Sequence, residues 1–163
     1  MLNGSTILRQ PNNSTEEQRH DFARLVRQGF RTAGAGLDSR IGAARCLAFH
    51  YALLDGLVAI AALKSPDDKY RRDVFKWASS PESYTDYAVE LGWVYVEPTY
   101  RESRIATRLC EHLLSITTID AVFATTRIDN AVMSRVLLTC GFDKVGTPFL
   151  YRDEQLGLYL RPC

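Results

Sequence analysis

The residues best suited to chemistry lie in one stretch, Glu90–Ala106, whose sequence is ELGWVYVEPTYRESRIA. Its first part predicts a β-strand that ends at Pro98, and a short polar turn then leads directly into an amphipathic helix. Such a junction points backbone N–H groups and the positive end of a helix at one place, which attracts an anion and above all a phosphate. Arg101, Arg104 and Arg108 add positive charge, although solvated arginines at an ordinary helix start give the same pattern.

Strands and helices are predicted to alternate on both sides of this stretch. Before it, the sequence predicts a strand over 7–10 and a helix that starts at a capping box, Ser14–Glu17, and continues to about Gly29. A mostly irregular segment follows, then a hairpin of strands 45–53 and 57–63, and then a helix over 67–78. From residue 87 on, it predicts strand 87–96, helix 104–116, strand 121–125, helix 130–140 and strands 142–146 and 156–160. The strand–helix–strand–helix–strand order of the second half favours parallel strands joined by crossover helices.

The second half also carries an ordered set of weak signals. The apolar strand Val122–Thr125 is followed by Asn130 at the start of a helix and, eleven residues later, by Gly141-Phe142. Asn at a helix start is most often an N-cap, and Gly after a helix is most often a C-cap. Each signal alone therefore indicates local structure, and only their order together points to a family.

This order resembles the GNAT superfamily of acyl-CoA-dependent N-acyltransferases. The family signature is Arg/Gln-x-x-Gly-x-Gly/Ala after a strand that ends in Val-x-Pro. Here the strand ends in Val96-Glu97-Pro98, and Arg101-Glu102-Ser103-Arg104-Ile105-Ala106 follows. The strand, the Asn-led helix and Gly141-Phe142 match a second signature. The resemblance therefore covers nearly the whole chain and is most specific over residues 89–146.

The resemblance implies an α/β fold and an enzyme. The expected fold is a mixed, mostly antiparallel central sheet of about seven strands that contains a parallel splayed pair and is flanked by four or five helices. Residues 1–163 are expected to form a single N-acyltransferase-like domain with a helical insertion at about 66–82. The implied reaction transfers an acetyl or other short acyl group from coenzyme A to a primary amine, with acetyl-CoA as co-substrate and no metal. The acceptor is a small molecule or a protein or peptide amine, and homodimers are common in the family.

The same resemblance assigns roles to individual residues. The loop wraps the pyrophosphate of coenzyme A with backbone N–H groups, the strand end binds the pantetheine arm and the acyl group, and Asn130 touches that arm. The cofactor-binding residues implied in this way are Val94, Tyr95, Val96, Arg101, Glu102, Ser103, Arg104, Ile105, Ala106, Thr107 and Asn130. A strand N–H at Val94 or Val96 would stabilise the negative charge that develops on the thioester oxygen.

The catalytic residue implied by the resemblance is Glu90, which stands six residues before Val96, where the histone-acetylating branch of the family keeps a base glutamate. A base is needed because the acceptor amine must be neutral to attack, and amines of the lysine type are mostly protonated at pH 7. Strand alternation would place Glu90, Gly92 and Val94 on one face, provided that no bulge intervenes. A surface glutamate is the ordinary alternative, and Glu97 at the strand end is the second candidate base.

Two positions depart from the family pattern. Leu137 stands seven residues after Asn130, where the family often has a tyrosine that protonates the leaving thiolate. Water, Cys140 or Tyr151 are the substitutes that the sequence offers. Arg104 stands where the family has its central glycine. Both departures keep open a second hypothesis, a catalytically silent acyl-CoA-binding or regulatory module of the same fold.

Composition argues against several other classes of function. The 163 residues carry a formal net charge of +1 with a pI near 7.7, so no nucleic-acid partner is expected. The longest apolar run, 57–63, is too short to cross a membrane, and the N-terminal sequence has no stretch of signal-peptide type, so a cytoplasmic location without membrane attachment is expected. The four cysteines and three histidines are scattered without metal-ligand spacing, so no metal site is expected.

Overall fold

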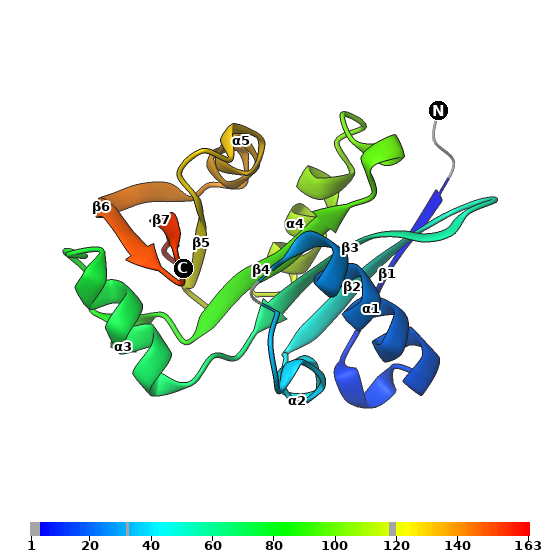
Figure 1. Ribbon diagram of the computed structural model, residues 1–163, viewed down its shortest axis with the longest axis horizontal. Coiled ribbons are helices and arrows are strands. Elements are labelled where there is room, and N and C mark those ends of the chain that lie inside the picture. Colours follow the sequence, from blue (N-terminus) through cyan, green and yellow to red (C-terminus); the bar gives the residue numbers. More distant parts are fainter. Residues whose placement is uncertain (1–3, 32, 118–119) are drawn as a thin grey trace. The chain divides into compact units, whose positions relative to one another are not determined.

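The computed structural model describes residues 4–31, 33–117 and 120–163, and Figure 1 labels its elements. The strands are β1 Gly4–Arg9, β2 Cys46–Ala52, β3 Gly56–Lys64, β4 Val89–Val96, β5 Val122–Arg127, β6 Asp143–Tyr151 and β7 Glu154–Arg161. The α-helices are α1 Glu16–Gly29, α2 Leu37–Gly42, α3 Asp68–Trp77, α4 Ile105–Ser115 and α5 Ala131–Thr139. Short 3-10 helices occupy Pro11–Asn13, Tyr84–Asp86 and Pro98–Tyr100.

The described strands form a seven-stranded mixed sheet in the order β1-β2-β3-β4-β5-β7-β6. The pairs β1–β2, β2–β3, β5–β7 and β6–β7 are antiparallel. Strands β4 and β5 are parallel, with Val89 opposite Val122 and Glu90 opposite Phe123. The connection between these two strands contains helix α4, since parallel neighbours need a long crossover. The predicted fold class, a mostly antiparallel sheet with one parallel pair and flanking helices, is confirmed.

The chain forms two compact units, each with its own hydrophobic core. Unit 1 comprises the described residues up to Lys64 together with Leu91–Ile116. Unit 2 comprises Ser65–Glu90 together with the described residues from Thr117 to Cys163. The boundary falls within β4, so its first two residues belong to unit 2 and the rest of the strand to unit 1. Among the described helices, none combines the length and the apolar character needed to span a bilayer.

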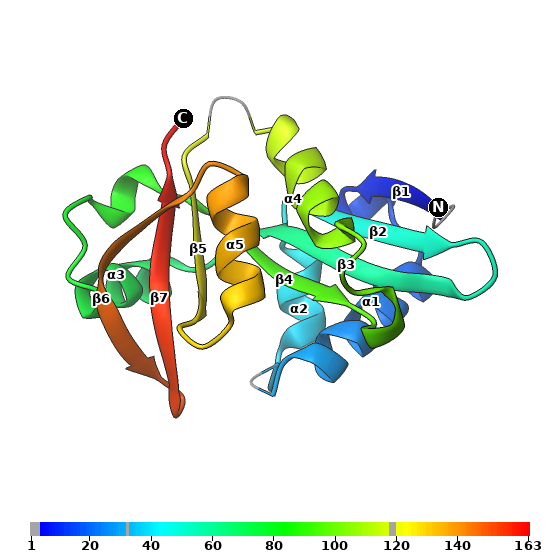
Figure 2. The ribbon, with the colours of Figure 1, turned by 90° about the horizontal axis from the view of Figure 1, so that it is seen from above.

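The core of unit 1 lies between helices α1 and α2 and one face of the β1–β2–β3 ladder. Phe22 of α1 is fully buried, and its ring meets Phe49 of β2 and Trp93 of β4 edge-to-face, with centroids 5.6 and 6.0 Å apart. Because side chains alternate along a strand, Ala48 and His50 point to the opposite face of β2. Helix α4 contacts β2 and β3 and covers that opposite face (Figure 2).

The core of unit 2 lies between helix α3 and strands β5, β7 and β6. Phe75 of α3 packs edge-to-face on Phe123 of β5, with centroids 5.4 Å apart, and its ring lies 5.6 Å from that of Tyr87. Strand β6 approaches the end of α3 at Gly146, whose φ of +64° lies in the left-handed region. A Cβ at this position would collide with the carbonyl oxygen of Ala78, so the close approach requires glycine.

The start of α1 differs from the predicted capping box. The N-cap is Thr15, whose hydroxyl accepts a hydrogen bond from the Gln18 N–H at 3.0 Å, while the Gln18 side chain accepts one from the Thr15 N–H at 2.9 Å. Ser14 instead donates its hydroxyl to the Pro11 carbonyl at 2.6 Å. The preceding 3-10 turn therefore uses the serine, and the helix begins one residue later than predicted.

The last hairpin is longer than the sequence predicts. Strand β6 continues through Gly146 to Tyr151, and its register with β7 shifts between Val145 and Phe149. A bulge of this kind accommodates a glycine and a proline that would otherwise end the strand. The predicted strand 142–146 therefore ends five residues before the observed end of β6.

Candidate functional site

Contacts inside unit 1 fix the segment that follows β4. The N–H of Glu97 donates to the carbonyl of Val58 on β3 at 2.9 Å, and the N–H of Tyr100 donates to the carbonyl of Glu97 at 2.9 Å. The Tyr100 hydroxyl donates to the carboxylate of Asp55 in the β2–β3 turn, and this bond raises the pKa of Tyr100 above its ordinary value. The turn after Pro98 is thereby held against the β2–β3 hairpin just before helix α4 begins.

Two arginines of this segment turn back onto its backbone. Arg101 donates its Nε–H to the carbonyl of Val96 at 3.0 Å, and its guanidinium lies over the ring of Tyr95, 5.8 Å from the centroid. Arg108 donates from Nη2 to the carbonyl of Ser103 at 3.3 Å. Both arginines are exposed. They therefore place two solvent-accessible cations beside the start of α4.

Helix α4 begins without a capping side chain. Its N-cap residue, Arg104, makes no side-chain hydrogen bond to the first turn. By contrast, Thr15 caps α1, Asp67 caps α3 and Asn130 caps α5. The first-turn N–H groups of a helix have no partner within the helix, and they lie at the positive end of its dipole. The start of α4 can therefore bind an anion with backbone N–H groups, as the sequence predicts for the loop.

The backbone at the start of α4 adopts a conformation that favours glycine. Arg104 has φ 61° and ψ 15°, and Glu102 has φ 65°. A residue with a Cβ is strained in this left-handed region by about 1–2 kcal/mol. Position 104 therefore has the left-handed backbone conformation that glycine adopts most easily, although its residue is arginine. The family that the sequence resembles has glycine at this position.

A buried histidine of β2 lies within the electrostatic influence of Arg108. His50 of β2 is buried, and its Nδ1 lies 2.8 Å from the Oγ1 of Thr6 on β1. Burial lowers the pKa of His50 below its ordinary 6.5, and the positive charge of Arg108 lowers it further. His50 is therefore uncharged near pH 7 and adds no positive charge to the segment.

Strand β4 is irregular in its middle. Trp93 has a φ of +51°, which interrupts the extended backbone. Its ring is buried in the core of unit 1, and the Lys64 ammonium lies 4.9 Å from the ring centroid. The predicted alternation of Glu90, Gly92 and Val94 on one face required a strand without a bulge, so it does not hold through residue 93.

Glu90 is buried in unit 2, with 3% of its surface exposed. It stands opposite Phe123 in the parallel ladder, and Phe123 points to the sheet face that α3 covers. The hydroxyl of Tyr70, in the first turn of α3, donates to Oε1 of Glu90 at 3.3 Å. The burial contradicts the alternative of a surface glutamate.

Tyr70 is a member of this site that sequence reasoning misses. Burial raises its pKa well above the ordinary value of 10, the charge of Glu90 raises it further, and a hydrogen bond from the Thr125 hydroxyl opposes both. Its ring meets Tyr151 of β6 edge-to-face, with centroids 6.0 Å apart. Tyr70 and Glu90 are 20 positions apart, and no sequence motif links them.

The remaining predicted residues of unit 2 have ordinary structural roles. Asn130 is exposed, and its side-chain oxygen accepts from the Met133 N–H at 3.0 Å, which is the usual contact of an N-cap. Leu137 is fully buried, and the free thiol of Cys140 is buried as well. Contact of Asn130 with a pantetheine arm therefore stays a prediction.

The predicted site residues thus form two groups. Unit 1 contains Val94, Tyr95, Val96, Arg101, Glu102, Ser103, Arg104, Ile105, Ala106 and Thr107. These residues form the end of β4, the turn that follows it and the first turn of α4. Unit 2 contains Glu90 and Asn130, and there the structure joins Glu90 to Tyr70.

Comparison with known proteins identifies the fold. No protein-family model and no curated protein matches the sequence. An acyl-CoA N-acyltransferase from Pseudomonas aeruginosa is 14% identical with a TM-score of 0.71, and the match covers 98% of this chain and 99% of that one. Escherichia coli ElaA is 14% identical with a TM-score of 0.69 over 97% and 99% of the two chains. A chain of the NatC complex, solved with Gag peptide and CoA, is 13% identical with a TM-score of 0.65 over 98% and 99%.

These likenesses define the class of fold. The chain has the fold of the GNAT acyl-CoA N-acyltransferases, which confirms at the level of architecture the resemblance read from the sequence. At identities of 13–14%, the likenesses establish the arrangement of strands and helices and leave activity to be argued from the residues themselves.

Proposed function

We propose that this chain is an acyl-CoA-dependent N-acyltransferase that moves an acetyl or other short acyl group to a primary amine. The observation that carries the proposal is the uncapped start of α4, which follows strand β4 through a turn with exposed arginines. The fold neighbours support the same class, because one of them is an acyl-CoA N-acyltransferase and another was solved with CoA.

In this proposal the segment Arg101–Thr107 binds the diphosphate of acyl-CoA through backbone N–H groups. The chemistry of the segment fits such a group, since backbone N–H groups at a helix start, a helix dipole and exposed guanidinium groups all favour a multiply charged anion. Residues Val94, Tyr95 and Val96 bind the pantetheine arm and the acyl group, and Asn130 contacts the arm. The Val96 carbonyl is occupied by Arg101 in the structure, so the backbone N–H groups of the strand end are the better candidates for this contact.

The proposed chemistry is a direct transfer. Glu90 takes a proton from the acceptor ammonium, directly or through a water molecule, and leaves a neutral amine. The nitrogen lone pair attacks the thioester carbonyl carbon, a C–N bond forms, and the C–S bond breaks, while the extra proton on the new amide nitrogen passes to solvent. The coenzyme A thiolate leaves and takes a proton from solvent, which replaces the tyrosine that the family often has at the position of Leu137. A strand N–H at Val94 or Val96 stabilises the oxygen during attack.

The second candidate is a catalytically silent acyl-CoA-binding or regulatory module. It is favoured by Leu137, which is fully buried and has no group to protonate a thiolate. The acceptor of the enzyme, a small-molecule amine or a protein or peptide amine, is not specified by any described residue. A single domain with an insertion at about 66–82, a cytoplasmic location and a homodimer also stay predictions.

Two measurements test the proposal together. Calorimetric titration with CoA should show binding, and release of free thiol from acetyl-CoA should depend on an amine drawn from a panel of small amines and peptides. Glu90→Gln should bind CoA as the wild type does but turn over about 10²–10⁴-fold more slowly. Glu82→Gln, at an exposed glutamate of the same unit, is the matched control and should retain wild-type turnover.

The outcomes separate the candidates. Absence of any heat with CoA would overturn the assignment of the α4 segment. Tight CoA binding without turnover on any amine would favour the silent module. Turnover that survives Glu90→Gln would remove Glu90 as the base, and Glu97→Gln would then test the second candidate.

A further inference from the structure

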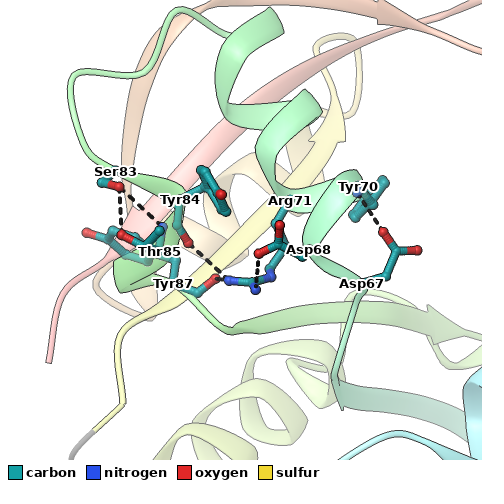
Figure 3. A network of polar contacts seen from close by, with 8 residues as sticks. All are labelled: Asp67, Asp68, Tyr70, Arg71, Ser83, Tyr84, Thr85 and Tyr87. Carbon is teal, nitrogen blue, oxygen red and sulfur yellow. Dashed lines mark hydrogen bonds and ion pairs between the residues drawn. The ribbon is translucent and has the colours of Figure 1, made fainter.

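Helix α3 is anchored to the chain segment that leads into Glu90. Asp67 is the N-cap of the helix, and its side chain accepts from the Tyr70 N–H at 2.7 Å and so fixes the first turn. One residue further, Arg71 donates from Nη1 to the carbonyls of Tyr84 and Tyr87 at 3.1 and 3.2 Å. Figure 3 shows this network, in which the guanidinium also pairs with an aspartate of its own helix at 3.2 Å. Because Tyr87 precedes Glu90 by three residues, the first turn of α3 is tied to the start of β4.

The far end of α3 is also fixed within unit 2. Phe75 packs on Phe123, the residue opposite Glu90 in the parallel ladder. The carbonyl of Ala78 accepts from the Thr147 N–H of β6 at 2.8 Å. A helix held at both ends presents its side chains to the sheet in a defined position. The Tyr70 hydroxyl therefore reaches Glu90 from a rigid support.

The side chain of Tyr70 faces groups on three elements. It donates to Oε1 of Glu90 at 3.3 Å, and the Thr125 side chain on β5 acts to lower the pKa of Tyr70. On β6 the ring of Tyr151 packs on Tyr70, and the Arg152 guanidinium lies 5.3 Å from the centroid of the Tyr151 ring. The Tyr70 hydroxyl stays protonated at neutral pH, because burial raises its pKa. It can therefore act only as a hydrogen-bond donor toward a carboxylate.

We propose that Tyr70 is a positioning residue for Glu90: its hydroxyl donates to the carboxylate and directs it for proton transfer. The inference rests on the proposed role of Glu90 as general base. A hydrogen bond to the charged form of a carboxylate stabilises that form, and a buried carboxylate without such a donor is protonated more easily. Helix α3 thus supplies part of the catalytic apparatus and does not merely cover the sheet.

The test is Tyr70→Phe, which keeps the ring and removes the hydroxyl. We expect kcat to fall about tenfold, the scale of a hydrogen bond to a charged group, with the KM for acetyl-CoA unchanged. We also expect the acidic limb of the rate–pH profile to move to higher pH. Tyr84→Phe is the matched control, because this tyrosine lies in the same network and its hydroxyl has no part in the proposal. It should leave kcat and the pH profile unchanged.

A second variant and a second readout keep the inference testable apart from activity. Thr125→Val should change kcat in the same direction but less, and its effect should disappear in the Tyr70→Phe background. Titration of the Glu90 carboxylate by 13C NMR should shift to higher pH in Tyr70→Phe, even if no amine substrate has been found.

The results also separate this inference from the proposed function. Loss of turnover in Glu90→Gln together with wild-type kcat and pH profile in Tyr70→Phe would overturn the positioning role and leave the proposed function intact. Full activity of Glu90→Gln would overturn both the base and its positioning. An unmoved carboxylate titration in Tyr70→Phe would overturn the positioning role whatever the activity.

Discussion

Replacement of Arg104 separates the two contributions of this residue, its charge and its backbone conformation. Arg104→Gly and Arg104→Ala both remove the guanidinium, but only glycine removes the Cβ that is strained at φ 61°. The two variants therefore differ only in how well they tolerate the left-handed conformation at the start of α4.

The expected difference follows from two opposing terms. Relief of the left-handed strain favours glycine by about 1–2 kcal/mol. The greater freedom of glycine in the unfolded chain costs about 0.5–1 kcal/mol. Arg104→Gly should therefore be more stable than Arg104→Ala by about 0.5–1 kcal/mol. For a chain of this length, each kcal/mol of added stability raises the Tm by roughly 2–4 °C.

Urea unfolding followed by circular dichroism measures this difference. The matched control is the same pair of variants at Arg108, which lies inside α4, where glycine should be less stable than alanine by about 1 kcal/mol. The sign of the glycine–alanine difference must therefore reverse between positions 104 and 108. Equal signs at the two positions would refute the left-handed conformation of Arg104.

Both Arg104 variants should also bind CoA about threefold to tenfold more weakly than the wild type, because a cation beside the diphosphate is lost.

Two further predictions concern the supports of the site. Gly146→Ala should lower the free energy of unfolding by about 2–4 kcal/mol, because it adds left-handed strain and displaces β6 from the Ala78 carbonyl. Gly141→Ala, at φ +87° but with only ordinary contacts, should cost about 1–2 kcal/mol in the same denaturation experiment, and equal losses would contradict the close approach. Because the pKa of His50 is lowered from 6.5, the unfolded chain binds the proton first as pH falls, so stability should decrease below about pH 6.5. The free energy of unfolding, measured between pH 7.5 and 5, should decrease less in His50→Gln than in the wild type. His20→Gln, a variant of an exposed histidine, is the control and should keep the wild-type dependence on pH. The same dependence on pH in wild type and His50→Gln would contradict the neutral buried state of His50.

The order of strands and helices could be predicted because local signals mark it. The Asp55-Gly56 turn, Pro98 after β4, Asn130 before α5 and Gly141 after it each act within a few residues, and the elements they bound are those of the structure. The lack of a capping side chain at α4 follows from the residue at its N-cap, because the Arg104 guanidinium has donors and no acceptor.

The features that the sequence does not reveal depend on contacts between distant segments. Tyr70 meets Glu90 only because α3 is held across unit 2, and Gly146 is needed only because β6 meets the end of α3. The positive φ of Trp93 likewise has no local cause, because tryptophan has no preference for that region. Sequence periodicity predicted a shared face for Glu90, Gly92 and Val94 only for a strand without a bulge, and it could not tell whether β4 meets that condition.

The irregularity at Trp93 makes the shape of β4, the strand to which we assign the pantetheine contacts in our proposal, depend on helix α1. The unfavourable backbone angle is maintained because the indole is clamped between Phe22 of α1 and the Lys64 ammonium. Substitutions that weaken the packing of the indole would let Trp93 adopt a negative φ. The peptide groups of residues 94–96 would then change their orientation. A random mutagenesis screen for lost acyl transfer should therefore recover changes in α1, a helix that contributes no residue to the proposed chemistry.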